Sequence, residues 1–228
     1  MLVTHETNRN GRDWVAGDIH GQYDTLFDAL TQAGFDSKHD RLFQVGDLID
    51  RGRDSFKCLS LAFEPWFFGV LGNHEQLALD AFRTGGSAWE LWMLNGGKWV
   101  YSENPNEVAA VLEKAMKHLP LVREINAGRY RVGMVHAEPP QDWLRLKDDV
   151  DVYRETLTWG RKRYEAQDNR VVSGINAVVV GHTIVKAPIW LGNVLYLDTG
   201  AFMKDGYLTL VPLDEIIAMT PSDFSDRS

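Results

Sequence analysis

The amino-acid sequence predicts an α/β fold in which two mixed β-sheets pack together and are flanked by helices. In the first half of the 228-residue chain, short apolar runs alternate with segments of helical period. That order favours parallel strands joined by crossover helices. In the second half, apolar runs flank a short turn-forming segment, which is typical of an antiparallel pair. Parallel and antiparallel pairs are therefore expected together.

Three units of strand, polar loop and helix are expected in the first half. Each strand is a short apolar run that ends at Gly-Asp or Gly-Asn. Gly34 is a suitable stop for the first helix, and Asp54 is a suitable N-cap for the second. The strands are expected at residues 14–16, 42–45 and 66–71, and the helices at 23–33, at 54–63 and from His74 onward.

The rest of the chain is expected to be mostly helical at first and then rich in strands. Apolar residues at helical spacing predict helices at 87–94 and 106–118, and Pro120 ends the second. A hairpin is predicted around Ala127-Gly128-Arg129, and no repeat or linker interrupts a single domain over residues 1–228. The hairpin strands are expected at 121–126 and 130–135, a polar and partly helical stretch at 141–170, further strands at 177–180, 194–197 and 207–211, and a frayed tail at 220–228.

The composition is that of an ordinary soluble globular protein, with 44% hydrophobic and 25% charged residues. No apolar run approaches the roughly 20 residues that span a bilayer, and the polar first 13 residues lack the apolar core of a signal peptide. Cys58 is the single cysteine and cannot form an internal disulfide, so a buried, inert thiol is expected. A cytoplasmic protein without a membrane partner is therefore predicted.

The formal net charge of −8 argues against the broad electrostatic attraction that non-specific nucleic-acid binding needs. No nucleic-acid partner is therefore expected. The same charge would repel a phosphorylated substrate at long range. Metal ions or specific arginines would have to reverse the field inside any phosphate site.

Five short blocks each place an oxygen or imidazole ligand at the end of an apolar run. Divalent metal ions take ligands of this kind, and no thiolate is among them. Glycine beside a ligand allows the loop to approach a metal closely, because glycine carries no Cβ. The blocks are Gly17-Asp18-Ile19-His20-Gly21, Gly46-Asp47-Leu48-Ile49-Asp50-Arg51-Gly52, Gly72-Asn73-His74-Glu75, Val135-His136-Ala137 and Gly181-His182-Thr183.

The ligand types in these blocks suit a site for two metal ions. Asp18 and His20 are one residue apart, so both can turn toward one ion in an extended loop. A carboxylate at Asp47 can bridge two ions, which typically lie about 3.5–4 Å apart in such sites. The remaining ligands are a neutral amide oxygen and two imidazoles, from Asn73, His136 and His182.

Each block alone has a simpler explanation. An Asp-x-His pair is more often a solvated turn, Asn73 could cap a helix, and a histidine after an apolar run is more often structural. Four of the seven histidines, however, fall within the blocks, and each follows an expected strand end. The joint pattern therefore predicts a two-metal hydrolytic site.

Together the blocks resemble the signature of the phosphoprotein phosphatase family of metallophosphoesterases: GD-x-HG, GD-x-x-DRG, GNHE, a lone His, then GH. The C-terminal run from Gly181-His182-Thr183 to Ala201 and the shortness of the chain are most similar to bacterial and bacteriophage-lambda-type serine/threonine protein phosphatases. The resemblance covers about residues 12–211 and implies a metallophosphatase-like fold, with metal ligands on loops at the carboxyl ends of strands. The longer C-terminal region of eukaryotic members is missing, so no obligatory regulatory subunit is inferred.

Carried over by position, the resemblance implies two overlapping ligand sets that share one carboxylate. The nitrogen and oxygen ligands allow manganese, iron, zinc or cobalt, and the similarity to bacterial and phage members favours manganese. The first ion would be bound by Asp18, His20 and Asp47, and the second by Asp47, Asn73, His136 and His182.

The resemblance also implies roles in proton transfer and phosphate binding. His74 would protonate the leaving alkoxide, while Asp50 would orient the imidazole and raise its pKa. Arg51 would bind phosphate oxygens with its planar guanidinium.

A second phosphate-binding arginine is implied by the run Trp159-Gly160-Arg161-Lys162-Arg163. Arg161 occupies the family's position and Arg163 is the competing choice, while a solvated helix face would explain the same charge cluster.

The spacing of Trp89 and Trp92, three apart on an apolar helix, favours inward packing over a substrate platform. The segment 85–106 around them could cover the site as a variable loop.

The predicted function is hydrolysis of phosphoserine or phosphothreonine in proteins or peptides by metal-activated water, without a covalent phosphoenzyme. The alternative is hydrolysis of dinucleoside polyphosphates such as diadenosine tetraphosphate, although enzymes of that kind usually carry another residue where Asp50 stands. The acidic charge and the pairing of His74 with Asp50 disfavour a nuclease or phosphodiesterase. The presence of every motif residue disfavours an inactive binding module.

Overall fold

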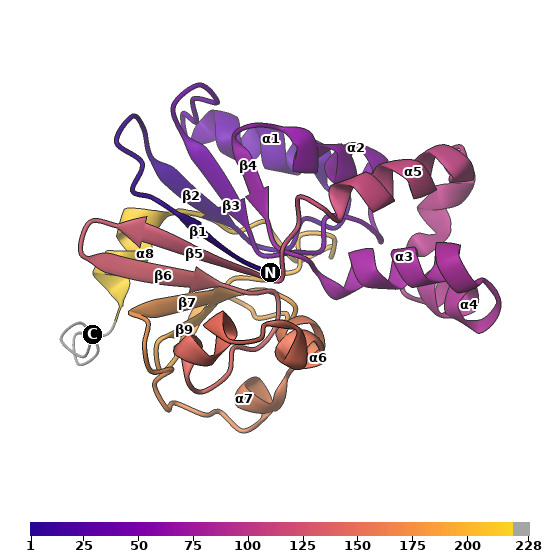
Figure 1. Ribbon diagram of the computed structural model, residues 1–228. Helices are drawn as coiled ribbons and strands as arrows, with labels where there is room; N and C mark the ends of the chain where they lie inside the picture. The colour runs from indigo at the N-terminus through magenta and orange to yellow at the C-terminus, as the bar shows by residue number, and fades with distance from the viewer. Residues whose placement is uncertain (221–228) are drawn as a thin grey trace.

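A computed structural model describes residues 1–220 and shows two β-sheets between layers of helices (Figure 1). The strands are β1 (Leu2–His5), β2 (Asp13–Ala16), β3 (Arg41–Gln44), β4 (Phe67–Gly69), β5 (Val122–Ala127), β6 (Tyr130–Met134), β7 (Ala177–Val180), β8 (Ile189–Leu191), β9 (Val194–Tyr196) and β10 (Leu210–Pro212). The α-helices are α1 (Tyr23–Gln32), α2 (Ser55–Ser60), α3 (Asn73–Thr84), α4 (Gly86–Leu94), α5 (Pro105–Ala115), α6 (Arg154–Trp159), α7 (Lys162–Glu165) and α8 (Leu213–Met219).

The first sheet has the strand order β10-β2-β3-β4. The pairs β2–β3 and β3–β4 are parallel, and β10 joins the edge of β2 antiparallel. Helix α1 connects β2 to β3, and α2 lies between β3 and β4 in the chain. The repeated strand–loop–helix units expected from the sequence are confirmed.

The second sheet has the strand order β1-β5-β6-β7-β9-β8. The antiparallel hairpin β5–β6 turns at Gly128, whose φ of 62° suits glycine. Strand β6 is parallel to β7, and β7 is parallel to β9. Both sheets are mixed, as the sequence predicts.

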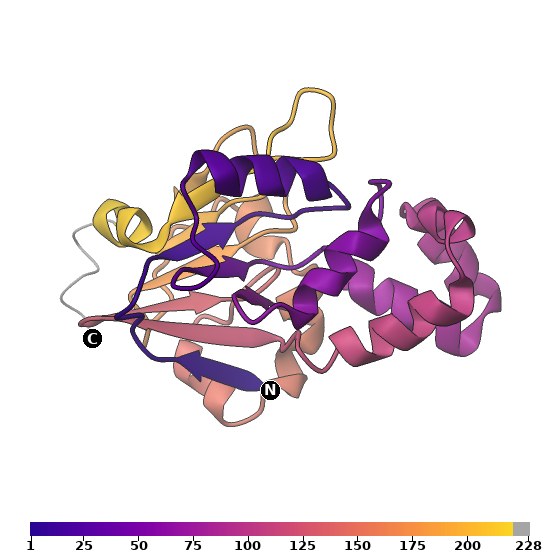
Figure 2. The same cartoon turned by 90° about the horizontal axis from the view of Figure 1, so that it is seen from above.

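A core of apolar side chains lies between the two sheets. Phe43 and Val45 from the first sheet share it with Met134 and Val179 from the second. Helices α1 and α2 cover the outer face of the first sheet, while α6 and α7 lie beyond the second (Figure 1). Helices α3, α4 and α5 gather at one end of the molecule, opposite α8 (Figure 2). Successive strand residues pack alternately toward the other sheet and toward the helices, as Phe43 and Leu42 do. The fold therefore has four layers: helices, sheet, sheet and helices.

The structure contains two strands and one α-helix that the sequence did not predict: β1, β8 and α8. Strand β1 is a sheet edge with only partial burial, so its apolar signal is weak. Strand β8 has three residues and reaches β9 through a tight turn at Gly192. The strand expected at 207–211 is shorter and begins at Leu210. The tail expected to fray lies outside the described residues after Thr220.

Asp54 stands at the N-cap position of α2 but does not cap the helix with its side chain. Its carboxylate instead pairs with Lys57 at 2.8 Å and with Arg53 at 3.1 Å. The predicted boundary is therefore confirmed and its predicted cause is wrong.

None of the helices described within residues 1–220 is long and apolar enough to cross a membrane.

Candidate metal centre

The five blocks come together at one edge, where the carboxyl ends of strands from both sheets meet. Parallel strands place their carboxyl ends at the same edge, and each ligand follows its strand within four residues. None of the six expected ligands is more than 7% exposed. They follow β2 (Asp18, His20), β3 (Asp47), β4 (Asn73), β6 (His136) and β7 (His182).

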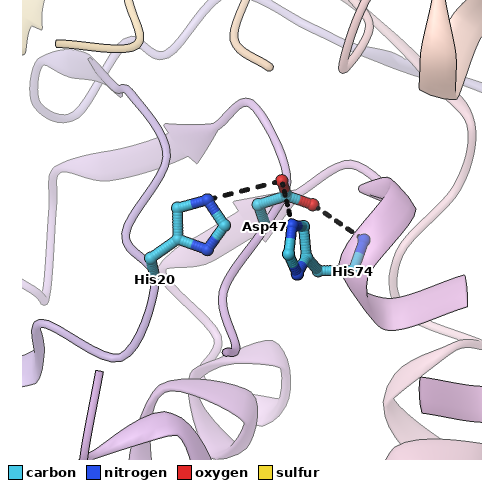
Figure 3. Close-up of side chains that lie close together, drawn as sticks. All are labelled: His20, Asp47 and His74. Carbon is cyan, nitrogen blue, oxygen red and sulfur yellow. Dashed lines mark hydrogen bonds and ion pairs between the residues drawn. The ribbon is translucent and has the colours of Figure 1, made fainter. Parts of the chain in front are cut away.

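Asp47 lies at the centre of this cluster. Its Oδ2 atom is 3.6 Å from His20 Nε2 and 3.9 Å from His74 Nε2 (Figure 3). The same oxygen is 3.4 Å from His136 Nε2. Asp47 therefore belongs to two groups that could each hold a metal ion, one with His20 and His74 and one with His136 and His182.

Asn73 faces the second group. Its Oδ1 atom is 2.8 Å from His136 Nε2 and 2.9 Å from His182 Nδ1. Gly72, and not Asn73, occupies the N-cap position of α3. The side chain of Asn73 is therefore turned into the site, and the simpler explanation of it as a helix cap is wrong.

Asp18 contacts the cluster at His182. Its Oδ2 accepts the backbone N–H of His182 at 3.0 Å. Its Oδ1 is buried and has no hydrogen-bond partner among residues 1–220. A buried carboxylate oxygen without a donor is unfavourable unless a cation satisfies it. This orphaned atom, within a set of nitrogen and oxygen donors, fits a divalent metal ion.

Backbone carbonyls orient two of the imidazoles. His20 Nδ1 lies 2.9 Å from the carbonyl of Ile49, and His136 Nδ1 lies 2.8 Å from that of Val45. A proton on each Nδ1 leaves the lone pair on Nε2, the ring nitrogen that lies 3.6 Å (His20) or 3.4 Å (His136) from Asp47 Oδ2. Burial lowers the pKa of His20 to about 3, so its ring is neutral and able to bind a metal at neutral pH.

The loops that carry the site have an unusual backbone. Six non-glycine residues of the described chain have positive φ, and five of them belong to the five blocks. Such conformations are costly and persist where the surrounding structure enforces them. The five are His20, Asp47, Asp50, Arg51 and His182.

Two glycines show how closely the loops approach one another. A Cβ atom on Gly72 would lie 2.1 Å from Asp47 Oδ1, and one on Gly181 would lie 1.9 Å from Asp18 Oδ1. Any side chain at either position would displace a ligand carboxylate. The glycines of the blocks are thus required by the packing of the site.

Glu75 is a buried residue of the site to which the sequence interpretation gave no role. Its carboxylate accepts the N–H groups of Asp47, Leu48, Ile49 and Gly72 at 2.8–3.2 Å. Burial, followed by the charge of Asp47, raises the pKa of Glu75 to about 7. Glu75 therefore holds the loop after β3 against the start of α3, and the last letter of GNHE was its only signal.

His74 and Asp50 form a buried pair beside the metal groups. His74 Nδ1 is 2.7 Å from Asp50 Oδ2. Burial disfavours the imidazolium, but the carboxylates of Asp47 and Asp50 outweigh it and raise the pKa of His74. The sequence expected His74 only as an acid, but His74 is itself a member of the first group: Asp50 engages its Nδ1, and its Nε2 faces Asp47.

The arginines differ in where their side chains point. Arg51 and Arg161 are solvent-exposed at the rim. Arg51 donates to His20 Nε2 at 3.0 Å, and Arg161 Nε donates to His182 Nε2 at 3.0 Å. Arg163 is buried and donates to the carbonyls of Asp168 and Arg170. Of the two arginines that follow Trp159, only Arg161 faces the site.

Comparison with known proteins agrees with this geometry. Residues 12–186 match the calcineurin-like phosphoesterase (Metallophos) family. The chain is 38% identical to serine/threonine-protein phosphatase 1 of Salmonella typhimurium over 200 residues, covering 86% of this chain and 89% of that protein. It is 36% identical to serine/threonine-protein phosphatase 2 of the same organism, covering 83% and 87%. A symmetrical bis(5'-nucleosyl)-tetraphosphatase of Dechloromonas aromatica is 44% identical, but over only 27% of this chain and 23% of that protein.

Solved structures share the fold. A structure provisionally described as a diadenosine tetraphosphatase aligns with a TM-score of 0.60 and 23% identity, covering 92% of this chain and 97% of that one. A serine/threonine phosphatase from Saccharomyces cerevisiae also aligns with a TM-score of 0.60, at 18% identity, covering 87% and 70%. At this level of identity the structures support the fold alone. The expected metallophosphatase-like arrangement of two sheets is confirmed.

The shared position of Asp47 leads to a prediction about metal stoichiometry. Asp47→Asn is expected to reduce bound metal from about two ions per chain to less than one, because both groups lose the same anionic oxygen. His136→Gln is expected to leave about one ion, because only the second group contains His136. Elemental analysis after equilibrium dialysis measures these ratios.

Asp40→Asn is the matched control, because Asp40 is a buried, hydrogen-bonded carboxylate outside the metal groups. It should retain the stoichiometry of the wild-type protein. Two tightly bound ions in Asp47→Asn would contradict the shared role of Asp47.

Proposed function

The chain belongs to the calcineurin-like phosphoesterase family, and from this premise we propose that it is a metal-dependent phosphatase acting on phosphoserine and phosphothreonine in proteins. The observation that carries the proposal is the buried His74–Asp50 pair beside a carboxylate shared by two metal groups. The serine/threonine phosphatases of Salmonella typhimurium match this chain over most of its length, which supports the same substrate class.

Six residues would hold the two metal ions in this proposal. Asp18, His20 and Asp47 would bind the first, and Asp47, Asn73, His136 and His182 would bind the second. When bound, such ions lower the pKa of water from 15.7 toward about 7 and neutralise phosphate charge. Manganese is the proposed metal because of the similarity to bacterial serine/threonine phosphatases. The nitrogen and oxygen donors also suit iron, zinc and cobalt.

His74 would act as the general acid. Its Nδ1 is engaged by Asp50, so Nε2 is the atom that can deliver a proton. The oxygen that leaves phosphoserine is a strongly basic alkoxide, so its protonation removes a large part of the barrier. Asp50 would keep the ring oriented and favour its protonated form.

Arg51 and Arg161 would bind the phosphate group from the rim. Each guanidinium already contacts an imidazole of the ligand set, so each is close to the position a phosphate would occupy. Planar guanidinium groups bind phosphate oxygens in pairs and stabilise the spread charge of the transition state. These two cations would overcome the repulsion from the acidic protein.

The single buried cysteine is consistent with our expectation of a cytoplasmic enzyme.

Substrate choice is tested by comparing a phosphoserine peptide with diadenosine tetraphosphate on the manganese-loaded protein. We expect kcat/KM to be at least about tenfold higher for the peptide. Bis(p-nitrophenyl) phosphate, a phosphodiester, provides the third arm and should be turned over poorly. Activity on the dinucleotide or the diester alone would contradict the proposed substrate.

The roles of the two candidate arginines are separable by substitution. Arg161→Ala is expected to lower kcat/KM for the phosphopeptide roughly 10- to 1,000-fold without lowering the unfolding temperature, because the exposed side chain would act on the phosphate. Arg163→Ala should mainly lower the unfolding temperature, since it removes a buried guanidinium and its hydrogen bonds to the carbonyls of Asp168 and Arg170. The exposed neighbour substitution Lys162→Ala is the control and should change neither quantity. A large activity loss confined to Arg163→Ala would reverse the assignment.

A further inference from the structure

Two tryptophans outside the five blocks hold the carboxylate of Asp50. Trp92 Nε1 donates to Asp50 Oδ1 at 2.9 Å and to Oδ2 at 3.0 Å. Trp99 Nε1 donates to Oδ1 at 2.7 Å. His74 Nδ1 lies 2.7 Å from Oδ2, so each carboxylate oxygen of Asp50 has two hydrogen-bond partners.

The tryptophans come from the segment 85–106, for which the sequence left open a role as a variable loop over the site. Helix α4, which the sequence predicted at 87–94, and a 3-10 helix, Gly97–Ser102, lie in this segment, and both indoles are buried. The carbonyl of Gly96 accepts the backbone N–H of Arg51 at 3.1 Å, so the segment also contacts the loop that carries Asp50. Leu94 at the end of α4 is 85% exposed. The segment therefore contacts the site through Trp92 and Trp99, which donate to the carboxylate of Asp50.

Burial alone does not account for this arrangement. Buried indole N–H groups need an acceptor, but any nearby carbonyl would satisfy each of them. Here two indoles converge on one carboxylate that is wholly buried. Aromatic contact between the rings, with centroids 6.0 Å apart, accompanies the shared acceptor.

An indole is a suitable group for fixing a carboxylate next to an acid–base residue. It donates a hydrogen bond but does not gain or lose a proton in the physiological range. It therefore fixes the carboxylate without competing with His74 for the proton. A carboxylate held only by His74 could rotate, and the imidazole would lose its fixed direction.

We propose that Trp92 and Trp99 are positioning residues that fix Asp50 and thereby direct His74 Nε2 toward the oxygen that leaves the substrate. This inference rests on the proposed phosphatase function. The tryptophans touch neither substrate nor reacting atoms, and they act through Asp50. Their contribution should therefore depend on how strongly the leaving group needs a proton.

The test compares two substrates on Trp92→Phe and Trp99→Phe, which keep an aromatic ring and remove the donor. A phosphoserine peptide needs a proton on its alkoxide, whereas p-nitrophenyl phosphate has a good leaving group and needs little help. We expect each variant to lose about tenfold or more in kcat for the peptide and clearly less for p-nitrophenyl phosphate. His74→Asn sets the limit, with a loss of about 100- to 10,000-fold on the peptide.

Trp143→Phe is the matched control. Trp143 is fully buried and donates one indole hydrogen bond to a buried carboxylate, Glu124 Oε2, at 2.8 Å outside the site. Its substitution removes the same kind of bond and should lower the unfolding temperature similarly. It should leave the ratio of the two kcat values unchanged. Equal losses on both substrates in Trp92→Phe and Trp99→Phe, or no loss, would overturn the inference.

A second measurement does not depend on activity. The NMR chemical shifts of the ring nitrogens of His74, assigned by comparison with His74→Asn, report its bond to Asp50 in the zinc-loaded protein. They should change in Trp92→Phe and Trp99→Phe and stay constant in Trp143→Phe. If the wild-type protein hydrolyses neither substrate while these shifts change, the proposed function fails and the positioning role stands. Unchanged shifts would refute the positioning role itself.

Discussion

The buried carboxylate of Asp47 is the constraint on which the rest of the site depends. Its Oδ2 atom lies within 4 Å of imidazole nitrogens of three histidines, two from loops after β2 and β6 and one from the start of α3. Its backbone carbonyl also accepts the N–H groups of Ile19 and His20, at 3.1 and 2.9 Å. The loops after the strands must therefore meet around one residue. The positive φ angles and the close glycine contacts of the site follow from that convergence.

Such a cluster is electrostatically costly in the absence of cations. Burial, followed by the charges of Asp198 and Asp47, raises the pKa of Asp18 well above its ordinary value. Burial would also raise the pKa of Asp47, but the imidazoles of His136 and His74 lower it well below the usual range. Asp198 is also buried, and its Oδ2 has no partner among the described residues. Divalent cations are the groups that would offset this concentration of buried acidic oxygen.

The sequence was informative where local pattern and ligand chemistry coincide. Strands β2, β3 and β4 could be predicted because each apolar run ends at a glycine followed by a polar ligand. The contacts of Trp92 and Trp99 with Asp50 could not, because they join residues 42 and 49 positions apart. Helical spacing correctly indicated that Trp92 packs inward, but it carries no information about which acceptor the indole finds. Likewise, nothing in the run of Arg161 and Arg163 indicated which side chain is buried.

The central claim is that one carboxylate is shared by two metal positions. The most direct measurement is a crystal structure of the manganese-loaded protein with anomalous diffraction data collected at the manganese edge. Two anomalous peaks about 3.5–4 Å apart, each within coordination distance of Asp47, are the predicted result. A single peak, or two peaks of which one is not coordinated by Asp47, would contradict the claim.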